Sequence, residues 1–323
     1  MQQSDVEAGQ TPLVISDLVP ASGGARRRPH WSFWYRRIGM PYLFLAPFLL
    51  VFLLFFILPL GYALWISFFN ERLVGGTIFV GLQNYQQVFQ DANFWEGVRN
   101  VALLLIVQVP VMLIFALVLS LLIDSQIVRW RPLFRLGYFL PYAIPSVIGA
   151  LLWGYLYSAH IGPFVQITNA LHLPAPGFLT ESGLLPSIGN MLVWQWTGYN
   201  MIVMYAALQA IPTELYDAAR VDGTSGWDIA RYIKIPLIMP AIVITIIFSI
   251  IGSLQLFAEP QIMYSIVPNL VQDHYSPNLY AYNLAFTDQE YNYSAAVSFV
   301  LGAVVFVSSY IFILVNNRRG RRS

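Results

Sequence analysis

Polar and aromatic residues gather at two places inside otherwise apolar stretches of the sequence. The set comprises Gln195, Trp196, Tyr199, Asn200, Ser253, Gln255 and Glu259. Amides and hydroxyls beside aromatic rings suit a neutral polyhydroxylated ligand, because its hydroxyls need hydrogen bonds and its C–H faces pack on rings. The same residue types also form interfacial aromatic belts and hydrogen bonds between helices. The sequence therefore predicts a ligand pathway at these residues, with a purely structural role as the open alternative.

Groups that catalyse covalent chemistry or bind metals are sparse. The sequence has no cysteine, and its four histidines fall in separate predicted loops without metal-ligand spacing. Ionisable residues are missing from the interiors of the apolar runs, since Arg99, Asp124 and Glu259 stand at predicted ends. Ion-coupled transporters commonly keep such charges inside their spans, although unwound backbone carbonyls can also bind sodium. We predict no catalytic residue, no bound metal and no ion coupling.

The lysine content excludes a P-loop nucleotide site on this chain. The P-loop pattern G-x-x-x-x-G-K-[ST] needs a lysine followed by Ser or Thr. The only lysine is Lys234, and Ile235 follows it. If ATP drives this protein, the site for ATP and Mg must lie on another polypeptide that contacts it.

The segment 211–240 has the pattern of two short surface helices. In the first helix, Thr213 is the predicted N-cap, and Gly223 supplies a left-handed residue after the end. Glu214 and Asp217 place negative charge near the positive end of the helix dipole. Such a capped helix can present a defined face to a partner.

One face of this first helix is small and apolar. At i, i+3 and i+4 spacing it carries Leu215, Ala218 and Ala219. Ser225 is the predicted cap of the second helix, which we expect to run to Lys234 before Pro236 ends it. A face of alanines lets a partner's backbone approach closely. Docking against another protein and a solvated connecting hairpin are both compatible with this pattern.

These residues must be held by membrane helices. Hydrophobic residues make up 57% of the chain and charged residues only 10%, a far more apolar balance than in soluble domains. A helix needs about 20 apolar residues to cross the hydrocarbon core. Six runs meet this requirement, near 41–69, 98–123, 136–158, 185–210, 238–258 and 294–315. The predicted fold is all-α, a polytopic membrane protein with six transmembrane helices.

The basic residues predict the orientation. All but two of the seventeen Lys and Arg residues, Arg72 and Arg99, fall on the side that holds both termini. The positive-inside rule therefore predicts that both termini are cytoplasmic. We divide the chain into a largely disordered tail at 1–40, a transmembrane domain at 41–315 and a basic tail at 316–323.

The segment 211–240 resembles the EAA loop of a known family, the permease subunits of ATP-binding-cassette (ABC) importers in the carbohydrate-uptake branch. The family signature reads roughly E-A-A-x-x-x-G, followed downstream by I-x-L-P. Its counterparts here are Asp217-Ala218-Ala219, Asp222-Gly223 and Ile233-Lys234-Ile235-Pro236, with Asp for Glu and Ile for Leu. Further stretches that look like counterparts in sugar permeases are Phe79 to Tyr85, Phe139 to Pro145 and Gln209 to Pro212. The resemblance covers nearly the whole chain.

By this resemblance the chain has the type I ABC importer permease fold and moves a sugar, an oligo- or disaccharide, by alternating access. It implies an ATPase-coupling site formed by Glu214, Asp217, Ala218, Ala219, Asp222, Gly223, Ile233 and Pro236. The implied partners are a second homologous permease, two ABC ATPase subunits that carry ATP and Mg, an extracytoplasmic sugar-binding protein and membrane lipid, with no nucleic acid. The implied location is the cytoplasmic (inner) membrane.

Three other functions compete with this one. An ion-coupled transporter and a membrane-embedded enzyme are both disfavoured, because the spans lack ionisable groups. A permease of the same superfamily for another neutral solute stays open.

Overall fold

The computed structural model describes residues 40–72, 75–125 and 128–320. The predicted N-terminal tail, apart from Met40, and residues 321–323 of the predicted C-terminal tail lie outside these ranges. The chain divides into two compact units, Met1–Pro59 and Leu60–Ser323. Each unit is described by itself below.

The described part of the first unit is helical. Helix α2 (Met40–Phe52) continues into the π-helical turn η2 (Leu53–Ile57) and then α3 (Leu58–Ile66), most of which belongs to the second unit. The π turn ends two residues before Pro59. A proline ring clashes with the carbonyl four residues earlier, and a widened turn relieves that clash.

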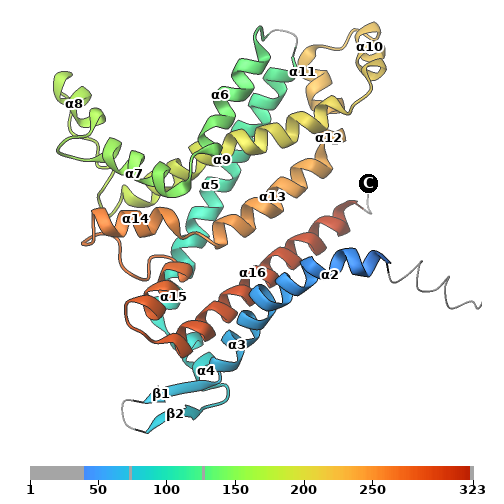
Figure 1. The fold of residues 1–323 in the computed structure, drawn as a ribbon. Helices are drawn as coiled ribbons and strands as arrows, with labels where there is room; N and C mark the ends of the chain where they lie inside the picture. Colours follow the sequence, from blue (N-terminus) through green and yellow to red (C-terminus); the bar gives the residue numbers. More distant parts are fainter. Residues whose placement is uncertain (1–39, 73–74, 126–127, 321–323) are drawn as a thin grey trace, which may run out of the picture. The chain divides into compact units, whose positions relative to one another are not determined.

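The second unit is built mainly from helices (Figure 1). Its longer helices are α5 (Ala92–Asp124), α6 (Arg131–Ala143), α7 (Ser146–Tyr157), α9 (Leu184–Gln209), α13 (Met239–Leu254) and α16 (Tyr291–Gly320). Shorter elements are β1 (Phe69–Arg72), β2 (Gly76–Phe79), α4 (Gln83–Gln90), α8 (Pro163–Ala170), α10 (Thr213–Val221), α11 (Gly226–Asp228), η3 (Ile229–Lys234), α12 (Ile235–Leu237), α14 (Ala258–Ile266) and α15 (Pro277–Phe286). The strands form one antiparallel hairpin.

Within the described ranges, four helical segments are long and apolar enough to cross a membrane. They are Tyr42–Ile66, Ala92–Asp124, Met239–Ile266 and Tyr291–Phe312, and the bent pair of α6 and α7 would make a fifth. Helix α9 has 26 residues but is not among them, because its Trp, Gln, Tyr and Asn residues lower its mean hydropathy. The prediction of a helical membrane protein is confirmed, whereas the number of six spans stays a prediction.

The third predicted span, near 136–158, is not one straight helix. The chain bends by 95° between α6 and α7. Pro145 lacks a backbone N–H and disfavours helical geometry at the preceding residue, and Ile144 accordingly has an extended ψ of 128°. The fifth predicted span, near 238–258, is also interrupted: α13 ends at Leu254, and α14 resumes at Ala258 and extends to Ile266.

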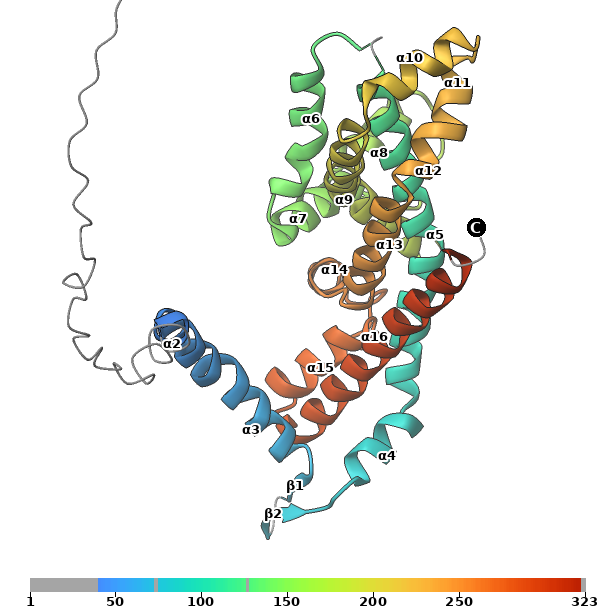
Figure 2. The same cartoon turned by 90° about the vertical axis from the view of Figure 1, so that its right-hand side faces the viewer.

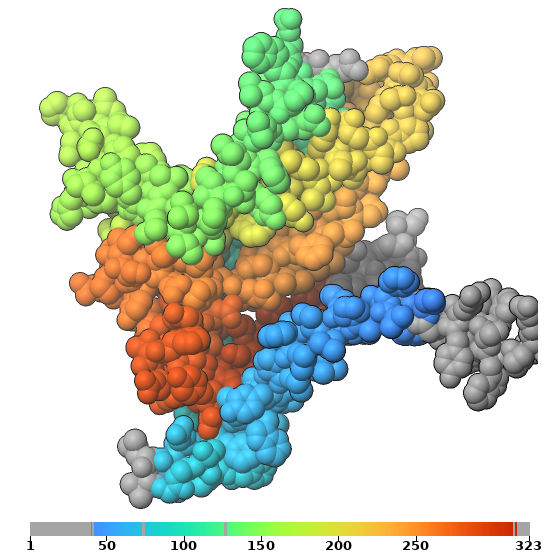
Figure 3. Space-filling model, viewed as in Figure 1, coloured from blue at the N-terminus to red at the C-terminus, as the bar shows by residue number. Residues whose placement is uncertain are grey.

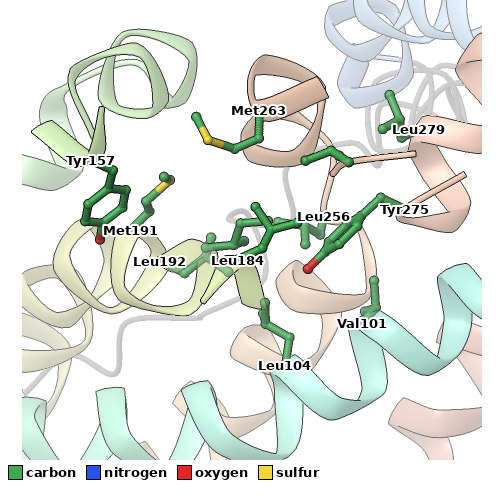
Figure 4. Close-up of a cluster of buried hydrophobic side chains, with 12 residues drawn as sticks. Val101, Leu104, Tyr157, Leu184, Met191, Leu192, Leu256, Met263, Tyr275 and Leu279 are labelled. Atoms are coloured by element: carbon green, nitrogen blue, oxygen red, sulfur yellow. The ribbon is translucent and has the colours of Figure 1, made fainter. Parts of the chain in front are cut away.

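The packing of α5 along α9 forms the centre of the second unit (Figures 1 and 2). A buried cluster joins these helices to α7, α14 and the loop before α15 (Figure 4). Three methionines of α9, Met191, Met201 and Met204, are almost fully buried. Methionine fits irregular gaps because its chain is unbranched and flexible. Two helices of mixed polarity thereby share a well-packed apolar contact.

The stretch from Phe79 to Tyr85 fastens the hairpin to the end of α3. The buried Asn84 amide donates hydrogen bonds to the carbonyls of Ser67 and Phe69, each at 2.8 Å. The Tyr85 and Ser67 hydroxyls lie 2.7 Å apart. Gly81 has a φ of 58°, which permits the tight turn before Asn84. One of the three stretches that resembled the sugar permeases thus has a structural role.

Asp91 joins several helices at the end of the second unit where the hairpin also lies. Its carboxylate caps α5 by accepting from the Asn93 N–H at 2.9 Å, and it accepts from the hydroxyls of Tyr280 and Tyr293 at 2.6 and 2.7 Å. Burial raises the pKa of the Asp91 carboxyl, but these hydrogen bonds bring it below its usual value. The start of α5 is therefore tied to α15 and α16.

Gly198 allows the closest approach between α6 and α9. A Cβ atom at this position would lie 1.7 Å from the carbonyl oxygen of Tyr138. The contact is with backbone, so it cannot be relieved by a change of rotamer. Any side chain here must push α6 away from α9.

We expect Gly198→Ala to destabilise the purified protein by ~1–3 kcal/mol or more, as overpacking of a core does. The matched control is Gly189→Ala on the same helix, where the new Cβ meets only the Gln108 Cβ at 4.0 Å. Thermal unfolding in detergent should show a loss of several degrees for Gly198→Ala alone. Equal midpoints for the two variants would contradict this account of the contact.

Candidate functional site

A small pocket of mixed polarity lies between α5, α9 and α13, with a cavity of about 70 Å³. The residues that line it are Gln108, Met112, Leu192, Trp196, Tyr199, Asn200, Phe248, Ser249, Gly252 and Ser253. Four of the predicted pathway residues are therefore brought together here: Trp196, Tyr199, Asn200 and Ser253. They come from two helices that are distant in sequence.

Gln108 is a polar residue of this pocket that was not predicted from the sequence, as is Ser249. It is only 5% exposed, and its Oε1 accepts a hydrogen bond from the Ser253 hydroxyl at 3.3 Å. Its amide nitrogen lies 3.4 Å from the Met112 sulfur, which the Asn200 amide also approaches, at 3.6 Å. The signal that could have identified Gln108 was its amide, which stands alone inside the second apolar run. All of the predicted pathway residues lie later in the chain, from Gln195 onward.

An aromatic surface adjoins the pocket. Tyr142 of α6 stacks on Tyr199 with ring centroids 4.8 Å apart and meets the edge of Trp196 at 5.3 Å. Trp196 keeps 38% of its surface exposed. Tyr142, which belongs to the stretch Phe139 to Pro145, was not predicted as a site residue. The close approach of α6 to α9 at Gly198 places Tyr142 beside these rings.

The other three predicted pathway residues do not line this cavity. Gln195 is buried and donates to the Ile144 carbonyl at 3.2 Å, a group that the break after α6 leaves without a helical partner. Gln255 is exposed at the end of α13, and Glu259 is buried in the first turn of α14. For Gln195 the structure supports the alternative of a hydrogen bond between helices.

A larger cavity of about 620 Å³ lies among α7, α8 and α9. Aromatic rings including Trp153, Tyr157 and Phe178 line it. None of the predicted pathway residues lines this cavity, whereas four of them line the pocket between α5, α9 and α13. The smaller pocket is therefore the better candidate for a ligand pathway.

The second candidate site is the projecting segment 211–237, which forms the yellow-to-gold lobe of Figure 3. The predicted first helix is present as α10, but it begins one residue earlier than expected. Pro212 occupies the N-cap and Thr213 is already helical, so the predicted Thr213 cap is wrong. Pro212 fixes the backbone before the first turn, which leaves Thr213 no capping geometry. Gly223 does adopt the left-handed conformation, with a φ of 77°.

The second helix begins with a capping box. The Ser225 hydroxyl accepts from the Asp228 N–H at 3.2 Å, and the Asp228 carboxylate accepts from the Ser225 N–H at 3.1 Å. Hydrogen bonds from the hydroxyl and N–H of Ser225 lower the pKa of Asp228. Pro236 does not end this helix as predicted, because the widened π turn η3 precedes it and helical geometry continues to Leu237.

The predicted coupling residues differ in exposure. Glu214, Asp217, Ala218, Asp222, Gly223 and Pro236 are exposed, Ile233 is half-buried, and Ala219 is buried. Asp217 accepts from Arg220 at 3.1 Å in an exposed ion pair. Large apolar side chains beside them also face outward, namely Leu215, Val221 and Trp227. Ala219 therefore packs inward, whereas Leu215 and Ala218 are available to a partner.

Among residues 40–72, 75–125 and 128–320, no group of three or more Asp, Glu or His side chains could hold a metal ion. What the two sites offer is neutral hydrogen bonding in the pocket and an exposed small-residue face on the projecting segment.

Comparison with known proteins identifies the family. The family described as "binding-protein-dependent transport system inner membrane component" matches residues 116–322. The chain belongs to this family. It is 32% identical to the lactose transport system permease protein LacF of Rhizobium radiobacter, over 84% of this chain and 91% of the relative. It is 28% identical to the arabinooligosaccharides transport system permease protein AraP of Bacillus subtilis, over 93% of this chain and 96% of the relative.

A solved structure shares the fold of this permease. It belongs to a bacterial ABC transporter involved in the import of the acidic polysaccharide alginate, with a TM-score of 0.79 at 22% identity. The likeness covers 90% of the permease described here and 99% of the matched chain. The predicted ABC importer permease fold is thereby supported, and the curated relatives are transport permeases and not enzymes.

Gln195 provides a test of the structural role assigned above. Gln195→Ala leaves the Ile144 carbonyl unsatisfied, and such a loss costs about 1–3 kcal/mol. Gln255→Ala removes an exposed amide and should change stability by less than ~0.5 kcal/mol. The midpoint of thermal unfolding of each purified variant measures both effects. A stable Gln195→Ala protein would show that the bond across the break contributes little.

Proposed function

We propose that this permease moves a sugar, an oligo- or disaccharide, across the cytoplasmic membrane by alternating access. The main observation in support of this proposal is that one pocket among membrane helices is lined by Gln108, Tyr199, Asn200 and Ser253. Its polar groups are neutral amides and hydroxyls, and Tyr142, Tyr199 and Trp196 add ring faces. This combination matches the hydroxyls and C–H faces of a sugar. The sugar-transporting relatives give independent support.

The pocket must open for a sugar to pass. A cavity of about 70 Å³ is far below the ~300–1,000 Å³ of ligand pockets. Helices α5, α9 and α13 must therefore separate during each cycle. This requirement fits a transporter that exposes its pathway to one side at a time.

The energy comes from a separate ATPase, on which ATP and Mg are bound. We assign its docking surface to α10 and the turn after it, from Glu214 to Gly223. Leu215, Ala218 and Val221 expose an apolar strip there, and Asp217 and Asp222 flank it with charge. Small residues permit close packing and exposed acids set the register. The second permease, a second ATPase and an extracytoplasmic binding protein complete the proposed assembly, with both termini of this chain in the cytoplasm.

The docking surface can be tested by a charge reversal. Asp217→Lys places a cation beside Arg220 on an exposed surface, so folding should be unaffected while association with the ATPase is lost. Asp288→Lys makes the same change at an exposed position of the turn after α15. The measurement is co-purification of an ATP-binding-cassette ATPase, with its ATP hydrolysis, through a tag on the full chain. Undiminished association of Asp217→Lys would refute the assigned surface.

The pathway can be tested by removing single contacts. Gln108→Ala and Tyr199→Ala should each lower sugar uptake roughly fivefold, the effect of about 1 kcal/mol of lost binding. Gln166→Ala, which removes an exposed amide in α8, is the control. Uptake of labelled di- and oligosaccharides is measured in proteoliposomes that contain the complete transporter and its binding protein. Wild-type uptake in both pocket variants would remove the pocket from the pathway.

A further inference from the structure

One buried ion pair joins the projecting segment to the membrane helices. The Lys234 ammonium, at the end of η3, contacts the carboxylate of Asp124, the last residue of α5. The two side chains are only 14% and 8% exposed. Lys234 is the only lysine in the sequence. The exposed Asp217–Arg220 pair, by contrast, joins two residues within α10.

Two more groups converge on this pair. The other oxygen of the Asp124 carboxylate accepts from the Gln209 amide at 2.7 Å, and Gln209 is the last residue of α9. The Lys234 ammonium also lies over the Tyr216 ring, 4.9 Å from its centroid, and Tyr216 belongs to the docking helix α10. Burial, followed by the nearby negative charge of Asp124, raises the pKa of the Tyr216 hydroxyl. Four elements therefore meet at one charge-assisted cluster.

The two membrane helices that end at this cluster, α5 and α9, both contribute residues to the pocket. Along α5, Gln108 stands about 24 Å from Asp124, at ~1.5 Å per residue. Along α9, Asn200 stands about 13 Å from Gln209 on the same basis. Helices transmit displacement along their length because their backbone hydrogen bonds resist stretching. A pull on Asp124 and Gln209 therefore reaches the residues that must separate for the pocket to open.

The remaining connection between the projecting segment and α9 is weak by comparison. The chain from Ala210 to Pro212 has no regular helix, so it can bend without moving α9. On the other side, η3 is a π turn, whose hydrogen bonding is less regular than that of an α-helix. Between α10 and α11, residues 222–225 also lie outside any helix, so backbone continuity alone restrains the tilt of α10 only loosely. The charge pair resists that tilt, because separating the partners breaks a charge-assisted hydrogen bond between two side chains that are largely shielded from solvent.

We propose that the Lys234–Asp124 link, with Gln209 and Tyr216, is the positioning contact that converts motion of the docked α10 into motion of α5 and α9. This inference rests on the proposed function of an ATPase-driven permease. Lys234 and Asp124 touch neither sugar nor nucleotide in this account. Their role is to make the projecting segment and the pocket helices move together.

The test combines a transport measurement with a distance measurement. Lys234→Met keeps the length of the side chain and removes its charge, and Asp124→Asn removes the opposite charge. In the complete reconstituted transporter, each variant should keep the ATPase bound and hydrolysing ATP, while sugar transported per ATP falls at least about fivefold, equivalent to ~1 kcal/mol. The charge swap Lys234→Asp with Asp124→Lys should recover part of this loss. Asp288→Asn, which removes an exposed carboxylate, should behave as wild type.

The distance measurement does not depend on transport. Because the sequence has no cysteine, spin labels can be attached at Val221→Cys and Leu122→Cys, both on exposed side chains. Double electron–electron resonance on the full chain should give a narrow distance distribution, which broadens with Lys234→Met and narrows again with the charge swap. An unchanged distribution in Lys234→Met, or an unchanged ratio of sugar to ATP, would overturn the proposal. If the wild-type complex moved no sugar, the proposed function would fail, and the distance distributions alone would decide the role of this link.

Discussion

The contact between α5 and α9 is the interaction on which the rest of the second unit depends. Helix α5 is tied at its start through Asp91 to α15 and α16, contributes Gln108 to the pocket, and ends at Asp124 beside the projecting segment. Helix α9 lies along it and ends beside the same carboxylate through Gln209. The interface is filled by flexible methionines and approached by α6 at Gly198. Every proposed element of function is therefore attached to one packed pair of helices.

The α5–α9 pair combines a buried apolar contact with a polar one. Leu104 and Ile188 belong to its fully buried apolar part, whereas Gln108, Asn200 and Ser253 form the pocket beside it. Neutral amides can be buried at modest cost when they bond each other, and they need no counter-ion. Such groups suit a pathway that is closed in one state and offered to a hydroxylated ligand in another.

Three prolines stand beside irregularities of the helices. Pro145 lies in the break between α6 and α7, where the chain bends by 95°. Pro59 and Pro236 each follow a π turn by two residues, and there the helix continues. The difference lies in the preceding residues, since a widened turn leaves space for the proline ring. A proline in the sequence therefore does not by itself say whether the helix ends, and Pro110 lies inside the uninterrupted α5.

The sequence by itself determined the class of the protein, because long apolar runs report directly on the membrane. It also determined the two short helices of the projecting segment and the turn at Gly223, which depend on local backbone preference. Tertiary structure alone decided that Trp196, Tyr199, Asn200 and Ser253 share a pocket and that Gln195 does not. It alone brought Gln108 to Ser253 and Lys234 to Asp124, pairs separated by more than a hundred residues. A single sequence records which side chains a helix carries, but which of them face each other depends on how helices cross and where they bend.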